Sequence, residues 1–401
     1  MTRIDEEKSK PCFSCRDGLV LLSSALALRV AWALLSRRFW GYSEDGLYDD
    51  GAFLEIARGF LRGAAPLSHP PGYPLLLAAF LSVGGWGVSL ARWAQMMASA
   101  ALPVLTYRAA LSLRLTRSAA LAAGLFVAFN PMLIYFSVRI MSETLYVALV
   151  LAFFAAWTRA WNSSSLKSAA FAGALGAAAA LTRGIILPFG GVLALVAFLR
   201  RREQPRWAPL VAVCGLAWAA AMAPWTAYNW TRYHRFIPVS VQGGWNFYEG
   251  LGDDADAVRL RPLEMAQEAR RLGLNDIFAL NAHFGAKAAS WIKAHPAAFL
   301  RICAAKALHF WRPFPGRPHS AASRVLSGLL TVILFAAALL GLRETARAPG
   351  AWFLFAWALY VNLIHSVFAS TMRYRLPIEP TLAVSAGAGV AALLRRGSKA
   401  V

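Results

Sequence analysis

The chain has 401 residues, of which 58% are hydrophobic and only 15% are charged, and its mean hydropathy is +0.48. Soluble globular proteins hold about 45–50% apolar and about 25% charged residues, so this composition excludes an ordinary soluble protein and indicates an integral membrane protein. The net charge of +21 would suit a nucleic-acid-binding protein. Most of the basic residues, however, stand in the gaps between long apolar segments, which is typical of a membrane topology signal. We therefore expect no nucleic-acid partner.

About ten apolar segments are long enough to cross roughly 30 Å of hydrocarbon as helices. The predicted spans are residues 18–36, 88–111, 118–136, 142–160, 168–183, 185–199, 207–224, 322–342, 351–369 and 376–394. Lysine and arginine gather in alternate gaps, for example in "RRREQPR" at 200–206. The positive-inside rule makes that face cytoplasmic, and an even number of spans puts both termini on it. The predicted location is a bacterial inner membrane, crossed many times.

Two long segments, residues 37–87 and 225–321, fall on the opposite, outer side. Both mix tryptophan, tyrosine and proline with short amphipathic stretches, which is typical of interfacial segments and not of separate soluble domains. The predicted fold class is therefore an all-α integral membrane protein, with amphipathic surface helices in the first and the large outer loops. Residues 1–401 are expected to form a single polytopic domain, without a separate soluble C-terminal domain.

The first outer segment contains "YDDGAFLEIARGFLRGAAPLSHPPGYPLLL" at residues 48–77. Apolar residues recur in it at helical spacing, which predicts a surface helix over residues 50–62. Asp49 and Asp50 stand at the start of this helix. An aspartate is a favoured N-cap, but one cap is enough for one helix, so the pair indicates a further role. Prolines after His69 hold that histidine near the acids, although a histidine here could also be a plain interfacial anchor.

Further ionisable residues stand at the outer ends of predicted spans. Glu143, in "SETLY", starts the fourth span, where a carboxylate should pair or work; Arg139 is one candidate ion-pair partner. Arg183, Arg373 and Arg375 lie on the outer side, against the orientation bias, and positive charge there calls for an anion. The arginine fork matches a phosphate, with snorkelling to lipid head groups as the alternative role.

In chain order, these motifs resemble the polytopic membrane glycosyltransferases of the GT-C fold, in particular the protein O-mannosyltransferase and aminoarabinose transferase group and its bacterial relatives. The resemblance covers nearly the whole chain and is carried by "DDGAFLEIAR", "HPPGYPLLL", "SETLY", "LTRG", "PWTAYNW" and "RYRLPIEP". It implies an acidic pair on a surface helix of the first outer loop and a sugar donor carried on a polyprenyl phosphate. This sequence departs from the family in having Asp50 where glutamate is usual.

The resemblance implies inverting transfer of the sugar from the polyprenyl-phosphate donor to an acceptor hydroxyl on the periplasmic face. Asp49 is predicted as the general base, and Asp50 and Glu143 complete the predicted catalytic acids. The predicted substrate-binding residues are His69, Tyr73, Arg183, Arg373, Tyr374 and Arg375. The one cofactor that the residues suggest is a divalent metal ion, for which Asp50, Glu143 and His69 are the candidate ligands. The acceptor can be a lipid, a glycan or a protein, and membrane lipids surround the chain.

The sequence is also compatible with two functions other than transfer. A lipid or solute transporter, including a flippase, would also be polytopic, but it would carry charged residues along a path through the bilayer. Arg29 is the deeply placed charge that the sequence offers for such a path, and it has no evident acidic partner. A non-catalytic membrane scaffold would need Asp49 and Asp50 only as a helix cap.

Overall fold

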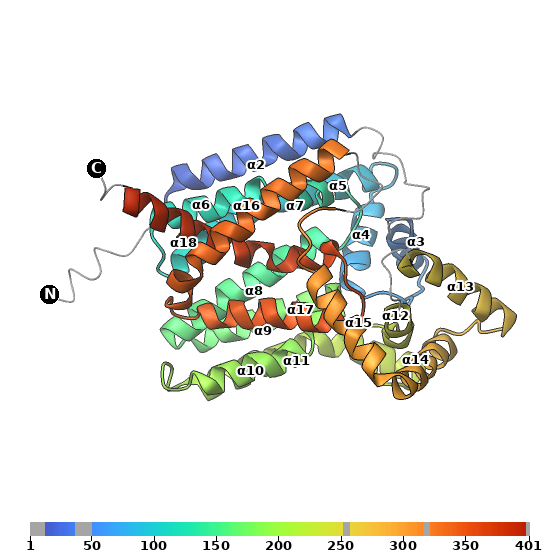
Figure 1. The fold of residues 1–401 in the computed structure, drawn as a ribbon. Helices are drawn as coiled ribbons and strands as arrows, with labels where there is room; N and C mark the ends of the chain where they lie inside the picture. Colours follow the sequence, from blue (N-terminus) through green and yellow to red (C-terminus); the bar gives the residue numbers. More distant parts are fainter. Residues whose placement is uncertain (1–12, 37–49, 252–256, 316–320, 398–401) are drawn as a thin grey trace.

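The computed structural model describes residues 13–36, 50–251, 257–315 and 321–397 of the chain. All regular secondary structure in these ranges is helical. Figure 1 shows a bundle of helices that lie side by side. They are α2 (Cys15–Leu35), α5 (Gly87–Ser112), α6 (Arg117–Ala128), α7 (Pro131–Phe136), α8 (Glu143–Ser163), α9 (Leu166–Thr182), α10 (Phe189–Leu199), α11 (Trp207–Tyr233), α16 (Ala321–Ala346), α17 (Ala351–Val367) and α18 (Glu379–Gly397).

The other helices gather at one end of this bundle (Figure 1). They are α3 (Asp50–Leu61), α4 (Gly72–Leu81), α12 (Gly243–Glu249), α13 (Ala257–Arg271), α14 (Ile277–Ala294), α15 (Pro296–His309) and the 3₁₀ turns η2 (Gly184–Ile186) and η3 (Met372–Ile378). Helix α2 begins and helix α18 ends at the opposite end (Figure 1). The two ends of the described bundle thus lie on the same side, as an even number of crossings requires.

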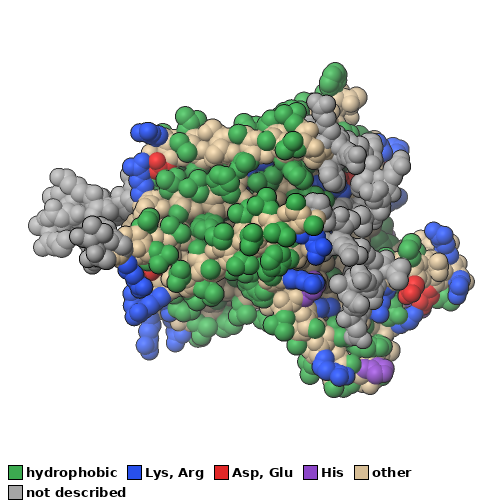
Figure 2. Space-filling model, turned by 45° about the horizontal axis from the view of Figure 1, so that its top comes forward, with side chains coloured by type: hydrophobic (Ala, Val, Ile, Leu, Met, Phe, Trp, Pro, Cys, Tyr) green, Lys and Arg blue, Asp and Glu red, His purple; other side chains and the backbone are tan. Residues whose placement is uncertain are grey.

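Among the described helices, five are both long and apolar enough to cross a bilayer: Cys15–Leu35, Glu143–Ser163, Trp207–Tyr233, Ala321–Ala346 and Met372–Arg396. Five more apolar helices or helical segments are shorter, with 10 to 17 residues, so the number of crossings stays open. Figure 2 shows hydrophobic side chains over the middle of the surface, with lysine and arginine toward both ends. This banded surface and the apolar helices make the chain a multi-pass membrane protein.

The prediction of one continuous span over residues 118–136 is wrong. The helix ends at Ala128, and a separate short helix, α7, begins at Pro131. Proline has no backbone N–H and favours the first turn of a helix, and the side chain of Asn130 caps this new start by accepting a hydrogen bond from the Leu133 N–H. Residues 117–136 therefore form two separate helices, α6 and α7.

The predicted surface helix is confirmed as α3, Asp50–Leu61. Its apolar side chains, such as Phe53 and Leu54, are buried against α4, whereas Glu55 is exposed and pairs with Arg62 at 2.6 Å. This division of apolar and charged faces is what the spacing of the sequence predicts for a helix that lies on a surface. Helix α3 therefore brings the acidic segment next to the ends of the membrane helices.

The outer helices α12, α13 and α14 are tied to one another by specific contacts. The N–H of Gly244 donates to the side-chain oxygen of Asn281 at 2.7 Å, and the backbones are so close there that a Cβ at residue 244 would lie 2.1 Å from the Asn281 carbonyl. Glu268 of α13 accepts hydrogen bonds from His283 and Lys287 of α14. These contacts fix the position of α12 beside the end of the bundle.

Candidate active site

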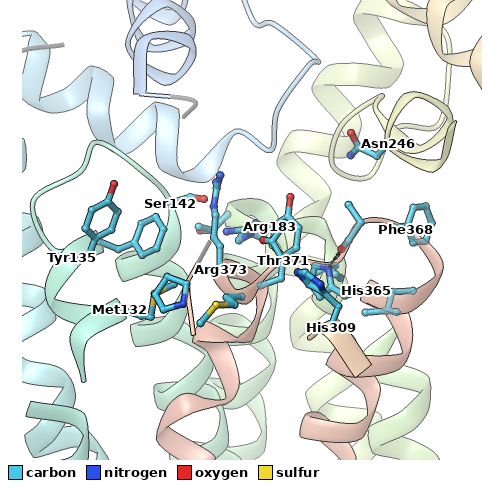
Figure 3. A pocket seen from close by; sticks show the side chains of 18 of the residues that line it. Met132, Tyr135, Ser142, Arg183, Asn246, His309, His365, Phe368, Thr371 and Arg373 are labelled. Carbon is cyan, nitrogen blue, oxygen red and sulfur yellow. Dashed lines mark hydrogen bonds between the residues drawn. The ribbon is translucent and has the colours of Figure 1, made fainter. Parts of the chain in front are cut away.

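A cavity of about 2020 Å³ lies between the ends of the membrane helices and the outer helices. Leu28 and Trp32 of α2, Met132 and Tyr135 of α7, and Leu326 and Leu330 of α16 line an apolar part of it. The polar part is lined by His69, Arg183, Asn246, His309, His365 and Arg373, and Figure 3 shows most of these side chains around one space. The cavity therefore has an apolar part and a polar part, and we call the polar part the polar chamber.

Two arginines of the polar chamber converge on one buried carboxylate. Glu143 is the first residue of α8 and its side chain is 2% exposed. Its Oε1 accepts a hydrogen bond from Arg183 Nη1 at 2.8 Å and a second from Arg373 Nε. The cluster joins three chain segments: α8, the end of α9, and η3. Two positive charges against one negative charge leave the cluster with a net charge of +1.

The guanidinium groups of this cluster are only partly buried. The side chains of Arg183 and Arg373 are 19% and 18% exposed, and both residues line the cavity. Arg183 also lies over the rings of Tyr146 and Tyr374, with 5.8 and 5.5 Å from its Cζ to the ring centroids. Because a guanidinium offers five N–H donors in a fixed fork, more than the shared carboxylate can accept, the cluster presents an anion-binding face to the cavity.

The acidic pair of the sequence is only half visible, since Asp49 lies outside the described residues. Asp50 begins α3, is 9% exposed and pairs with Arg139, with 3.2 Å between Oδ2 and Nε. Burial raises the pKa of Asp50 above its ordinary value, and the nearby Arg139 charge acts against this rise. Arg139, the candidate partner that helical spacing offered for Glu143, pairs with Asp50 instead, and Glu143 pairs with Arg183 and Arg373.

The structure brings most of the predicted substrate-binding residues to the cavity. His69, Arg183, Arg373 and Tyr374 all line it. His69 comes from the turn before α4 and packs edge-on against Phe53 of α3, with 5.2 Å between the ring centroids. The prolines that follow His69 in the sequence therefore place it at the rim between α3 and the polar chamber.

Tyr73 and Arg375, also predicted to bind substrate, do not line the cavity. Tyr73 is 5% exposed under α3, where its hydroxyl donates to Gln95 Oε1 at 2.9 Å. Arg375 is fully buried, pairs with Glu379 at 2.6 Å and donates to the carbonyl groups of Phe310 and Arg312. The polar groups of both side chains bond to other groups inside the protein and do not face the cavity, so the geometry gives the two residues a structural role.

The residues suggested for a divalent metal do not fit one. Within the described ranges, no three histidine, cysteine, aspartate or glutamate side chains come together as a metal site would require. Asp50 faces Arg139, and Glu143 faces two arginines. Guanidinium charges that already neutralise a carboxylate leave it a poor ligand for a divalent cation.

Comparison with known proteins agrees with this architecture. Residues 68–225 match the sequence model of the family described as dolichyl-phosphate-mannose-protein mannosyltransferase. No curated protein matches the chain in sequence. Among solved structures, the archaeal oligosaccharyltransferase AglB from Archaeoglobus fulgidus superposes with a TM-score of 0.61 and 12% identity, over 96% of this chain and 52% of that chain. ArnT from Cupriavidus metallidurans, in its apo state, gives a TM-score of 0.54 and 18% identity, over 93% of this chain and 60% of that chain.

The chain has the GT-C fold. Both superpositions include nearly all of this chain. They include only about half of the AglB chain. The predicted fold class and the resemblance carried by the sequence motifs are thereby confirmed. The bundle, the surface helix α3 and the outer helices around the cavity are the parts of this GT-C fold that the described residues supply.

Several polar residues of the cavity lining are absent from the set predicted by the sequence, among them Asn246, His309 and His365. Asn246 and His309 lie in outer segments rich in polar residues, where no spacing distinguishes them. His365 does carry a signal, because it stands in the apolar run "NLIHSVF" of a predicted span. An ionisable residue inside a membrane segment is a candidate functional residue by default.

Proposed function

We propose that this protein is an inverting glycosyltransferase that moves a sugar from a polyprenyl-phosphate donor to an acceptor hydroxyl. The observation that carries the proposal is the pair of cavity-facing arginines, Arg183 and Arg373, held together by Glu143 in a cavity that also has an apolar part. A lipid chain fits the apolar part of the cavity, and its phosphate then meets the net positive charge of the cluster.

The chemistry needs little from the protein beyond placement and charge. The acceptor hydroxyl attacks the anomeric carbon, the bond between that carbon and the phosphate oxygen breaks, and a single displacement inverts the anomeric centre. Polyprenyl phosphate is a weakly basic leaving group, so it departs without a general acid if positive charge meets it. Arg183 and Arg373 supply that charge in this proposal, and the sugar-free lipid phosphate is the product they release.

The proton of the acceptor hydroxyl needs a base. Asp49 is the proposed base, since it precedes the buried start of α3 and a carboxylate can take the proton as the hydroxyl attacks. Asp50, which is held by Arg139, is proposed to fix the start of the helix and thereby the position of its neighbour. No metal ion takes part in this scheme.

The similar proteins support the proposal through what their descriptions say of them. The matching family is described by its dolichyl-phosphate-mannose donor, and the AglB structure contains an inhibitory peptide and a dolichol-phosphate. Lipid phosphate and a hydroxyl-bearing acceptor are the corresponding partners proposed for this chain, with a lipid, a glycan or a protein as the acceptor. We place the cavity on the periplasmic face of a bacterial inner membrane and both termini in the cytoplasm.

The test is transfer by the purified protein from undecaprenyl-phosphate sugars, compared with Asp49→Asn and Arg183→Gln. Asparagine is as good an N-cap as aspartate but cannot act as a base, so we expect transfer to fall by about 10²–10⁴-fold at unchanged thermal stability. Arg183→Gln should weaken binding of undecaprenyl phosphate, and Arg183→Lys should restore only part of it because the fork is lost.

Near-normal transfer by Asp49→Asn would show that this aspartate only caps its helix. If the wild-type protein instead moves the intact lipid across vesicle membranes without transferring the sugar, a transporter function replaces this proposal.

A further inference from the structure

His365 is a buried histidine of α17 whose ring faces the polar chamber. It is 8% exposed and lines the cavity together with Arg183, Arg373 and Thr371, as Figure 3 shows. Helix α17 is otherwise strongly apolar, and a histidine in such a helix costs stability unless its polar atoms find partners. The partners of its two ring nitrogens therefore decide what this residue does.

The ring is held in place by two aromatic neighbours and by one hydrogen bond. The Tyr374 ring stacks on it almost in parallel, with 4.3 Å between centroids and an interplanar angle of 7°, and the Phe310 ring lies at 6.4 Å and 21°. Nδ1 and the carbonyl oxygen of Ala369 are 2.9 Å apart. Because a carbonyl oxygen can only accept, Nδ1 carries the proton and donates it.

This hydrogen bond fixes the chemistry of the other nitrogen. With the proton on Nδ1, the neutral ring carries its lone pair at Nε2. Within the described part of the chain, Nε2 has no hydrogen-bond partner, and the ring borders the cavity. An acceptor that is fixed in orientation and open to a cavity can take a hydrogen bond from a donor group of a molecule that enters the cavity.

The surroundings restrict which ligand group can be that donor. An ionised phosphate or carboxylate has no hydrogen to donate, whereas a sugar hydroxyl does. Arg183 and His365 both contact the Tyr374 ring: the Arg183 Cζ lies 5.5 Å from its centroid, and the His365 ring stacks on it at 4.3 Å. A group that meets Nε2 while the phosphate meets the arginines is therefore close to the phosphate-linked sugar.

We propose that His365 is a specificity-determining residue that accepts a hydrogen bond, through Nε2, from a sugar hydroxyl in the polar chamber. The inference rests on the proposed transferase function and adds the subsite that recognises the sugar. The hydroxyl belongs either to the sugar of the donor lipid or to the acceptor, and the experiment below separates these two sources.

The decisive variant is His365→Phe, which keeps an aromatic ring between Tyr374 and Phe310 but has no nitrogen. We expect it to lower kcat/KM for transfer by about three- to tenfold, the effect of one lost hydrogen bond, while its affinity for undecaprenyl phosphate stays at the wild-type value. His365→Gln can place an oxygen near the position of Nε2 and should recover part of the loss. Ser366→Ala is the matched control, because Ser366 bonds only to its own helix.

Monodeoxy substrates identify the hydroxyl. If the donor supplies it, one monodeoxy undecaprenyl-phosphate sugar should be used equally by wild-type protein and His365→Phe; if the acceptor supplies it, one deoxygenated acceptor should show this equality instead. Wild-type kinetics in His365→Phe with every substrate, or an equal loss of affinity for the sugar-free lipid, would overturn the inference. If the wild-type protein transfers no sugar, the proposed function fails. In that case the affinities of wild-type protein and His365→Phe for undecaprenyl phosphate, with and without its sugar, are compared. A loss of affinity in His365→Phe for the sugar-bearing lipid alone supports the role of His365, and equal affinities of the two proteins overturn it.

Discussion

The ion pairs of Glu143 with Arg183 and Arg373 lead to a specific prediction for Glu143→Gln. The substitution keeps the size of the side chain and one acceptor oxygen but removes the negative charge that two arginines share. If the carboxylate holds three chain segments together, the variant should lose stability. If the Glu143 carboxylate instead takes part in catalysis, as the sequence alone suggests, the variant should lose transfer activity at unchanged stability.

The magnitude follows from the burial of the three groups. Opposite charges about 4 Å apart attract by roughly 4 kcal/mol each at an effective dielectric constant of about 20, and burying the carboxylate offsets much of that gain. Breaking a fully buried pair typically costs about 3–5 kcal/mol, because the remaining charge is left without a partner. Here the arginines are 19% and 18% exposed, so cavity water can solvate them. We therefore expect the free energy of unfolding to fall by about 2–3 kcal/mol.

The assay is unfolding in mixed detergent micelles, with binding of undecaprenyl phosphate as the second measurement. Affinity for the lipid should not fall, since removing the carboxylate makes the cluster more positive. Glu55→Gln is the matched control: its side chain is 62% exposed on α3 and its arginine partners are also exposed, so this substitution should leave the free energy of unfolding nearly unchanged. Unchanged stability of Glu143→Gln together with abolished transfer would refute the structural role.

Two further predictions concern topology and pH. A cysteine at Leu272, which is 54% exposed after α13, should react with an impermeant thiol reagent in intact cells, whereas one at Arg201 should not; the reverse pattern would invert the proposed orientation. Lys306 donates to the Phe368 carbonyl at 2.7 Å, and burial lowers its pKa from 10.5 to about 8. Between these two pKa values the unfolded chain binds more protons at Lys306 than the folded chain, so this residue makes stability rise with pH. The difference in thermal midpoint between wild type and Lys306→Met should accordingly shift in favour of wild type across this window, and a constant difference would contradict it.

The membrane architecture could be predicted from the sequence because it depends on length and hydropathy. An apolar run of about 20 residues has one satisfactory form in hydrocarbon, a helix, so α8 and α16 lie close to their predicted positions. The break between α6 and α7 could not be predicted in the same way, since hydropathy continues through it and only Asn130-Pro131 marks it. A proline inside an apolar run either stays within a helix, as Pro103 does in α5, or starts a new one, and local packing decides between the two.

The sequence predicts which types of residue form the candidate site better than it predicts which of them pair with one another. An acid and several arginines at the outer ends of spans indicate a charged site, and Glu143, Arg183 and Arg373 do meet. Helical spacing, however, favours Arg139, four residues away, as the partner of Glu143. The real partners come from α9 and η3, 40 and 230 residues distant, and helical spacing holds no information about contacts at that range.

The two arginines of "RYRLPIEP" look alike in the sequence, since both are positive charges at the outer end of a predicted span, but they take different positions in the structure. Arg373 and Arg375 both place a positive charge on the outer side, yet only Arg373 reaches the cavity. They stand two residues apart in a 3₁₀ turn, which has about three residues per turn, so their side chains leave the backbone in different directions. Glu379 follows Arg375 by four residues, the spacing of a helical ion pair, and this pair is what the structure contains at 2.6 Å. An arginine with an acid at that spacing can find its anion within its own segment. Arg373 has no acid at that spacing and pairs with Glu143 of α8 instead, and in the proposed reaction it also meets the phosphate of the donor.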